Sequence, residues 1–137
     1  MRKFLGIDYG TKRIGLATNI ASLVEPLCVV DNKTDKSNLI VSKYALSAIA
    51  KICQEKAIEQ IIVGLSEGLM AEKTKLFAKL LAAKTNLPVT MIDETLSSYE
   101  VAHKLKEAHF SLKKRQEPID HYSAAVILEN FLESLPT

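Results

Sequence analysis

Acidic residues stand at three points of the sequence where strands or helices are expected to end or begin. Asp8 closes a short apolar run, the pair Asp93 and Glu94 closes another, and Asp120 begins the last apolar helical pattern. Carboxylates that converge raise one another's pKa unless cations balance their charge. Sites made only of oxygen ligands favour Mg²⁺ or Mn²⁺. These acids therefore predict a site for one or two divalent cations that activate water against a phosphodiester.

Other catalytic arrangements have no support in the sequence. It contains no HExxH, P-loop or GxGxxG motif, and no Ser-His-Asp order. Its histidines, His103, His109 and His121, are scattered, and we expect none of them to bind metal. The acids also have plain structural explanations, because Asp8 could cap a turn, Asp93 and Glu94 precede a helix, and Asp120 stands where an N-cap belongs.

The elements that would position these acids form an α/β pattern. Short connections between strands at 4–8, 13–18 and 26–30 predict an antiparallel meander. Continuous apolar runs at 60–65 and 88–92 predict two strands buried on both faces. Helices are expected at 37–56, 70–84, 97–108 and from 118 onward. The order predicts a mixed five-stranded sheet, three strands antiparallel and then two parallel, with helices on both faces.

Two of these helices carry an apolar face that we expect to pack on the sheet. In the segment 37–56 the apolar positions with helical spacing are Leu39, Ile40, Tyr44, Leu46, Ile49, Ile52 and Cys53. In the segment 70–84 the expected inner side consists of Leu76, Phe77, Leu80 and Leu81. The carboxyl ends of parallel strands meet at one edge of an open sheet, and ligands bind there. The last helix, packed over that edge, would bring Asp120 close to Asp8.

Four segments in order carry a resemblance to a known family. They are GIDYGTKRIGLA at 6–17, IVGL at 62–65, DETLSS at 93–98 and DHYSAAVIL at 120–128. Together they resemble the YqgF/RuvX family of pre-16S rRNA nucleases, collinearly over nearly the whole chain. The resemblance implies an RNase H-like fold related to Holliday junction resolvases. It also implies that Asp8, Asp93, Glu94 and Asp120 are the catalytic acids, with Asp8, Glu94 and Asp120 binding Mg²⁺ or Mn²⁺.

Two positions depart from the pattern of this family. Thr95 replaces the arginine that commonly follows the acidic pair, so a phosphate contact there must come from another residue. The glycine-rich segment after the middle strand is shortened to residues 66–70. This change puts the shape of the substrate in doubt and introduces Glu67, a candidate extra acid of the site.

Basic residues flank the acids in the sequence. Lys12 and Arg13 follow Asp8 closely, and Thr11 beside them could donate a hydrogen bond to a phosphate. A second cluster precedes Asp120 and consists of Lys113, Lys114 and Arg115. Solvated surface charge explains each base equally well when taken alone. The two clusters together favour a nucleic-acid partner, either structured RNA or branched DNA.

The composition indicates a single soluble domain. The chain has 137 residues, of which 47% are apolar and 25% charged, with a net charge of +2. This length suits one domain. Together with the family resemblance, it leads us to expect that residues 1–137 form a single RNase H-like nuclease domain. No apolar run approaches the ~20 residues of a membrane span, and we expect no membrane partner. Cys28 and Cys53 have no CxxC spacing and are expected to be buried and reduced, which favours the cytoplasm.

Four functions remain to be compared. The leading one is a metal-dependent nuclease that processes the ends of pre-16S rRNA during ribosome biogenesis. A resolvase of branched DNA in recombination or repair would need a dimer, whereas the RNA enzyme could be a monomer or homodimer. A non-catalytic nucleic-acid-binding module would keep the fold without cleavage. The phosphate loop of sugar kinases resembles residues 8–11, but those enzymes need two such domains.

Overall fold

The computed structural model describes residues 2–34, 40–65, 68–93 and 120–136. Five strands form one mixed sheet in the order β3-β2-β1-β4-β5. They are β1 (Phe4–Asp8), β2 (Arg13–Ile20), β3 (Leu23–Asp31), β4 (Gln60–Leu65) and β5 (Val89–Asp93). β1 pairs antiparallel with β2, and β2 pairs antiparallel with β3. On its other side β1 pairs parallel with β4, and β4 pairs parallel with β5. The predicted sheet is therefore confirmed.

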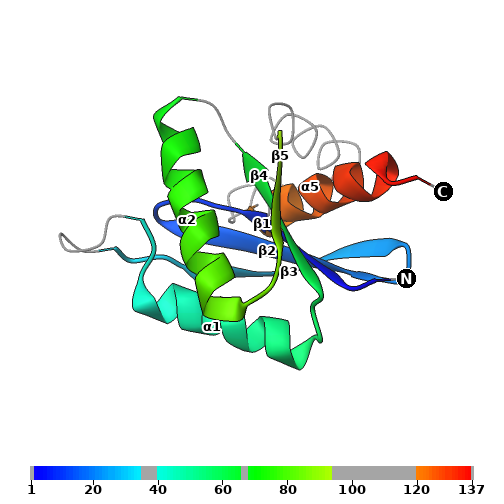
Figure 1. Cartoon of the computed structure of the whole chain (residues 1–137), viewed down its shortest axis with the longest axis horizontal. Coiled ribbons are helices and arrows are strands. Elements are labelled where there is room, and N and C mark those ends of the chain that lie inside the picture. The colour runs from blue at the N-terminus through cyan, green and yellow to red at the C-terminus, as the bar shows by residue number, and fades with distance from the viewer. Residues whose placement is uncertain (1, 35–39, 66–67, 94–119, 137) are drawn as a thin grey trace, which may run out of the picture.

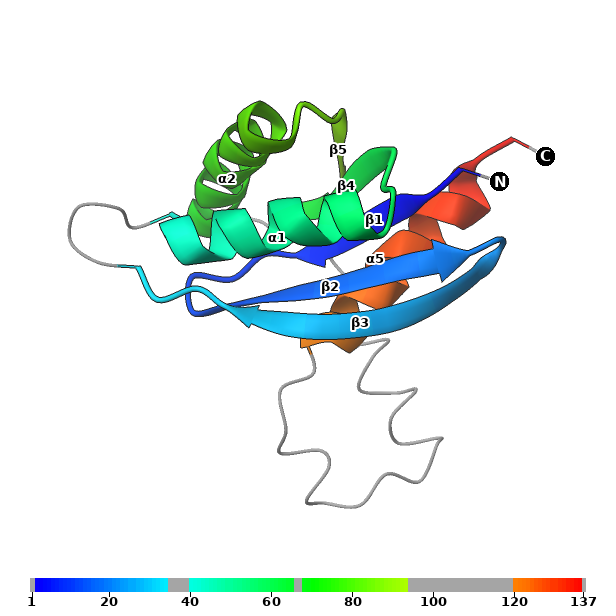
Figure 2. The ribbon, with the colours of Figure 1, turned by 90° about the horizontal axis from the view of Figure 1, so that it is seen from below.

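Helices pack on both faces of this sheet. They are α1 (Lys43–Glu55), α2 (Leu69–Thr85) and α5 (Asp120–Ser134). Helices α1 and α2 lie on one face, and α5 crosses the opposite face (Figure 1 and Figure 2). None of the helices in the described part of the chain is both long and apolar enough to cross a membrane. The helix expected at 97–108 lies outside the described residues.

Alternation along the strands divides the core into two layers. Leu5 and Ile7 of β1 belong to the cluster that packs with α1 and α2. Phe4, on the other face of β1, packs with Ile127 and Phe131 of α5. Because successive side chains of a strand point to opposite faces, Asp8 shares the α5 face with Phe4.

Helix α1 begins later than the sequence predicts. Ile40, Val41 and Ser42 precede the helix, whereas the apolar spacing predicts that they lie in it. The Ser42 side chain accepts a hydrogen bond from the Ala45 backbone N–H at 3.0 Å, which caps the helix at this point. The apolar spacing alone did not reveal this cap.

The buried faces of α1 and α2 also differ from the prediction. On α1 the buried residues are Ala45, Ile49 and Cys53, whereas Tyr44 is 70% exposed. On α2 Phe77 and Leu81 are buried as predicted. Leu76 and Leu80 are 50% and 42% exposed, because the inward stripe continues through Thr74 and Ala78 instead. Tyr44 is therefore an aromatic residue that the core does not use.

The third strand is longer than predicted and contains a proline. β3 begins at Leu23, and the pairing with β2 shifts between Leu16 and Ala17, opposite Cys28 and Pro26. β3 is an edge strand, so the missing N–H of Pro26 breaks no ladder on its open side. Both cysteines are free, but only Cys53 is buried, since Cys28 lies half-buried on this edge strand.

Candidate active site

Glycine residues on two neighbouring strands allow α5 to lie directly on the sheet. A Cβ built on Gly15 would lie 2.0 Å from the Asp120 carbonyl oxygen and 2.6 Å from the His121 nitrogen. A Cβ built on Gly6 would lie 2.8 Å from the Leu128 Cβ. Any larger residue at position 15 would push away the first turn of α5. The sequence therefore places the backbone of Asp120 against β2.

Asp8 lies next to this contact. It is the last residue of the central strand β1, and its register partner across the antiparallel ladder is Gly15. Directly opposed residues of an antiparallel pair have Cα atoms about 5 Å apart and side chains on the same face. Asp8 is half-buried, and Asp120 sits on the glycine beside it. The structure therefore brings these two predicted acids together from positions more than one hundred residues apart.

Arg13 pairs with one of the two acids. Its Nε lies 3.1 Å from Asp120 Oδ2, and the two side chains are 49% and 25% exposed. Exposed pairs of this kind contribute little to stability. The pair nevertheless fixes the direction of the Asp120 carboxylate and leaves other guanidinium N–H groups for further acceptors. The sequence predicts Arg13 as a phosphate ligand, and the structure shows that it also contacts a predicted catalytic acid.

Asp93 is placed differently from the other two acids. Register through β4 puts Asp8 level with Ile92, two strands or about 10 Å away. Ile92 packs with the cluster beneath α5, so its neighbour Asp93 starts on the opposite face of the sheet. Asp93 is exposed there. The structure brings it to the same edge of the sheet as Asp8, but not to the same face.

Several predicted site residues lie outside the described residues. They are Glu67, Glu94, Thr95, Lys113, Lys114 and Arg115. Within the described ranges, no three acidic, histidine or cysteine side chains come close enough to hold a metal ion. Among the described residues at the contact between α5 and β2, Asp8 and Asp120 offer the hard oxygen donors that suit Mg²⁺ or Mn²⁺. The described part of the chain thus fits two ligands of such a cation.

Two buried side chains hold the turn that follows Asp8. Tyr9 is buried, stacks on Phe77 with ring centroids 4.6 Å apart, and donates its hydroxyl proton to the Ile40 carbonyl oxygen. Burial raises the pKa of this hydroxyl, which therefore stays protonated. Asn32 donates its side-chain amide to the carbonyl oxygens of Gly10 and Ile40, at 3.0 Å each. The turn is thus tied to the segment that leads into α1.

Asn32 makes further bonds that complete this anchor. Its backbone N–H donates to the Lys12 carbonyl oxygen at 2.8 Å, and its Oδ1 accepts from the Ser42 N–H at 2.8 Å. With only 1% of its surface exposed, Asn32 is a buried hub rather than a surface turn residue. The sequence did not reveal this role, because residues 31–33 have the composition of an ordinary turn.

A shallow groove of about 530 Å³ lies beside this turn. Its lining consists of Thr11, Lys12, Arg13, Asp31, Asn32, Lys33 and Thr34, and we call it the basic groove. It contains the three residues of the first predicted phosphate-binding cluster and adds Lys33. Three bases stand against one acid, so the groove favours an anionic ligand. Arg13 belongs both to this groove and to the pair with Asp120.

His121 follows Asp120 in the first turn of α5. Its Nδ1 is buried without a hydrogen-bond partner among the described residues, and its ring lies 4.3 Å from that of Tyr122. Burial lowers the pKa of this imidazole, and the neighbouring Asp120 charge partly opposes the shift. The ring is therefore mainly neutral near pH 7.

The sequence matches a described family over almost its whole length. The family model for RuvX, described as Holliday junction resolvase, matches residues 2–134. A relative from Protochlamydia amoebophila (strain UWE25), named "Putative pre-16S rRNA nuclease", is 32% identical over 140 residues. The match covers 96% of this chain and 93% of that relative. A relative of the same name from Anaeromyxobacter sp. (strain Fw109-5) is 34% identical, with 96% of both chains covered.

Solved structures share the fold. RuvC of T. thermophilus in complex with a Holliday junction substrate matches with a TM-score of 0.63 and 16% identity. That match covers 98% of this chain and 95% of the RuvC chain. The fowlpox virus Holliday junction resolvase matches with a TM-score of 0.57 and 13% identity, covering 98% and 99% of the two chains. At these identities the likeness establishes the RNase H-like fold.

Proposed function

The chain belongs to the RuvX family, and on that premise we propose that it is a divalent-metal-dependent nuclease that processes the ends of pre-16S rRNA. The observation that carries the proposal is the seating of Asp120 on Gly15, beside Asp8. Two carboxylates held close together on one face of a sheet repel each other, and a bound divalent cation would balance their charge. The names of the relatives support the RNA substrate.

Asp8 and Asp120 would hold the cation, and we assign the third ligand to Glu94. Asp93 starts on the opposite face of the sheet, which favours its neighbour in the sequence for this role. Thr95 and Glu67 receive no role. When bound, Mg²⁺ or Mn²⁺ would activate water and neutralise charge on the phosphodiester. The whole chain would act as a single nuclease domain.

Arg13 would position one acid and bind substrate. Its Nε donates to Asp120 Oδ2 and so holds the carboxylate in one direction. The remaining guanidinium N–H groups would donate to a phosphate oxygen next to the bond that is cut. Thr11 and Lys12 stand beside it in the basic groove and would bind the adjacent phosphate. Lys113, Lys114 and Arg115 are proposed to contact the substrate as well.

The family description favours a second candidate function, resolution of branched DNA. That reaction would need two copies of the site in a homodimer, since two strands must be cut with matching symmetry. Processing of an RNA end needs only one site. A cytoplasmic location suits the RNA function, and the two free thiols fit a reducing compartment.

The test compares cleavage of two labelled substrates with Mg²⁺ or Mn²⁺. One is precursor 16S RNA and the other is a four-way DNA junction, each given to the parent protein and to Asp8→Asn. We expect RNA cleavage by the parent and none by the variant. Cleavage of the junction alone would move the assignment to the resolvase. Equal cleavage by the variant would reject Asp8 as a catalytic acid, and no cleavage of either substrate would favour a non-catalytic binding module.

A further inference from the structure

A second hollow continues the basic groove away from the acids. It has a volume of about 280 Å³ and is lined by Asp31, Lys33, Ser42 and Tyr44. We call it the Tyr44 pocket. It shares Asp31 and Lys33 with the basic groove, so the two hollows form one surface. This surface begins at Arg13, beside Asp120, and ends at Tyr44 in the first turn of α1.

Tyr44 is the unexplained residue of this surface. Helical spacing predicts it on the buried face of α1, but 70% of its surface is exposed. The core contacts of α1 are made by Ala45, Ile49 and Cys53 instead. An exposed aromatic ring beside a lysine offers a flat apolar face next to a positive charge. Nucleobases stack on such rings, and the neighbouring charge binds the backbone phosphate.

The place of the surface is fixed by buried contacts. Asn32 joins the turn at Gly10 to the backbone of Ile40 and Ser42, so Lys12 and Tyr44 are held on one frame. Asp31 ends β3 opposite Arg13 in the ladder register. The groove is therefore attached to the same edge of the sheet that carries Asp8.

We infer that this surface binds a single-stranded segment of the nucleic-acid substrate, with one base stacked on Tyr44. Lys12, Arg13 and Lys33 bind phosphates along the path between the acids and the ring. Asp31 accepts hydrogen bonds and so faces a ribose hydroxyl or a base amino group. A duplex cannot use this site in the same way, because the faces of its bases are covered by their neighbours. The inference rests on the proposed nuclease function and adds the form of its substrate.

Binding is tested by fluorescence anisotropy with labelled strands of about 12 nucleotides. RNA, DNA and a duplex of the same sequence are compared, in the Asp8→Asn background so that nothing is cut. Tyr44→Ala should weaken binding of single strands by about five- to 100-fold and leave duplex binding unchanged. Tyr44→Phe should restore the affinity, because it keeps the ring. The RNA and DNA strands show which of the two the groove prefers.

The lysine has a matched control. Lys33→Gln should weaken binding and reduce the dependence on salt by about one phosphate contact. Lys84→Gln removes another exposed lysine, from the last turn of α2 at the opposite edge of the sheet, and should change neither quantity. Equal effects of both changes would show that binding depends on the overall positive charge of the protein and not on this groove, and would overturn the inference.

A spectroscopic signal reports the stack itself. The chain has no tryptophan and four tyrosines, so tyrosine emission can be observed directly. A bound single strand should quench the parent more than Tyr44→Phe, although both bind with similar affinity. Identical quenching, or single-strand binding that Tyr44→Ala leaves intact, would overturn the inference. Weakened binding by Tyr44→Ala in a protein that cuts neither substrate would keep this inference and reject the nuclease.

Discussion

Asn32 shows how a single buried side chain can hold the turn that follows Asp8 in place. Its amide and carbonyl groups tie the turn after Asp8 to the start of α1, and the residue is buried. Removing one partner from a buried hydrogen bond leaves the other polar group unsatisfied, at a cost of about 1–3 kcal/mol. The effect on stability can be separated from the effect on function, because a second asparagine, Asn19, is equally buried and also hydrogen-bonded to backbone groups.

Asn32→Ala should lower the free energy of unfolding by about 2–3 kcal/mol and also lower the cleavage rate. Asn19 is the matched control, because it is equally buried at 1% exposure. It accepts from the Phe4 N–H at 2.8 Å and donates to the carbonyl oxygens of Arg2 and Ala21. Asn19 lies near the end of β2, beside the start of β1 and away from Asp8. Asn19→Ala should lower the free energy of unfolding by a similar amount, measured by urea unfolding. If it lowers cleavage by the folded protein as much as Asn32→Ala, the positioning role is wrong.

The positions of individual residues were predictable from the sequence where they depend only on the neighbouring part of the chain. Asp8 and Asp120 could be found because each stands at the end or start of an element. Asn32 and Tyr44 could not, since one depends on bonds to distant backbone atoms and the other on which stripe of α1 faces the core. Propensity and periodicity carry no information on either point.

At the scale of elements, the contact between α5 and the sheet decides where Asp120 lies. The contact is close because Gly6 and Gly15 present no side chain to the helix. Glycine within a strand weakens it, and such a position often marks the close approach of another backbone. The sequence predicts both the strand and the helix, but the distance between them follows only from the three-dimensional pairing of β1 with β2.

Gly15→Ala should destabilise the protein by about 3 kcal/mol or more and abolish cleavage. Its new methyl group would meet the Asp120 backbone at 2.0 Å, so the helix must move. Gly68→Ala serves as the control, because its Cβ meets nothing within 4 Å and only its φ of +69° is unfavourable. That change should cost about 1–2 kcal/mol and leave cleavage intact. Urea unfolding and cleavage assays measure both, and a fully active Gly15→Ala would contradict the proposed seat of Asp120.

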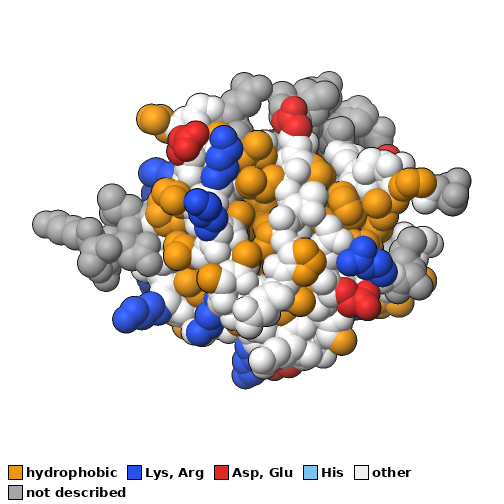
Figure 3. Space-filling model, in the orientation of Figure 1, with side chains coloured by type: hydrophobic (Ala, Val, Ile, Leu, Met, Phe, Trp, Pro, Cys, Tyr) orange, Lys and Arg blue, Asp and Glu red, His pale blue; other side chains and the backbone are white. Residues whose placement is uncertain are grey.

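At the scale of the whole molecule, charge is distributed unevenly around a net value of only +2. Lys and Arg side chains gather over α1 and α2 on the face shown in Figure 3, where acidic side chains are few. Helix α2 alone carries Lys73, Lys75, Lys79 and Lys84. The mean charge therefore conceals local basic surfaces, and of these the basic groove is the one that we assign to the nucleic-acid substrate.

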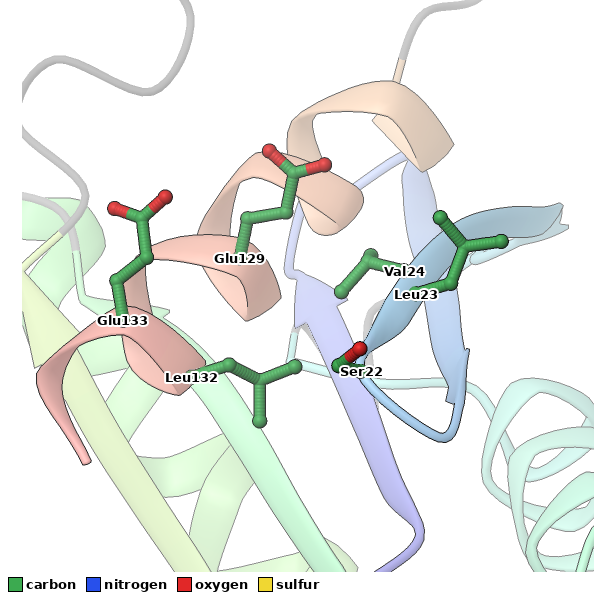
Figure 4. A pocket seen from close by; sticks show the side chains of 6 residues that line it. All are labelled: Ser22, Leu23, Val24, Glu129, Leu132 and Glu133. Carbon is green, nitrogen blue, oxygen red and sulfur yellow. The ribbon is translucent and has the colours of Figure 1, made fainter. Parts of the chain in front are cut away.

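The opposite face has a different character. A hollow of about 360 Å³ between the β2–β3 turn and α5 is lined by Ser22, Leu23, Val24, Glu129, Leu132 and Glu133. Figure 4 shows the two glutamates on α5 and the apolar side chains from both elements. Its acidic and apolar lining does not suit a phosphate backbone. The substrate path is therefore assigned to the edge with Arg13 and Lys33.

The topology of the sheet was largely predictable, because short connections and continuous apolar runs determine the strand order. The face of the sheet on which each acid lies was not, since it depends on the residue at which a strand begins. A shift of one residue would exchange the faces of Asp93 and Ile92. The structure thus places Asp8 and Asp120 close together, whereas Asp93 starts on the other face of the sheet.

The central claim is that Asp8 and Asp120 act together in metal-dependent cleavage. Its most direct test is the single-turnover rate of precursor 16S RNA cleavage, in Mn²⁺, by Asp8→Asn, Asp120→Asn and the control Glu133→Gln, which changes an acid of the hollow outside the substrate path. Mutation of a residue that supports a metal ligand typically lowers activity about 10–100-fold. Loss of the ligand itself should therefore slow cleavage by more than ~100-fold in the first two variants. Glu133→Gln should stay within about tenfold of the parent rate. Parent-like cleavage by Asp8→Asn or Asp120→Asn would contradict the account.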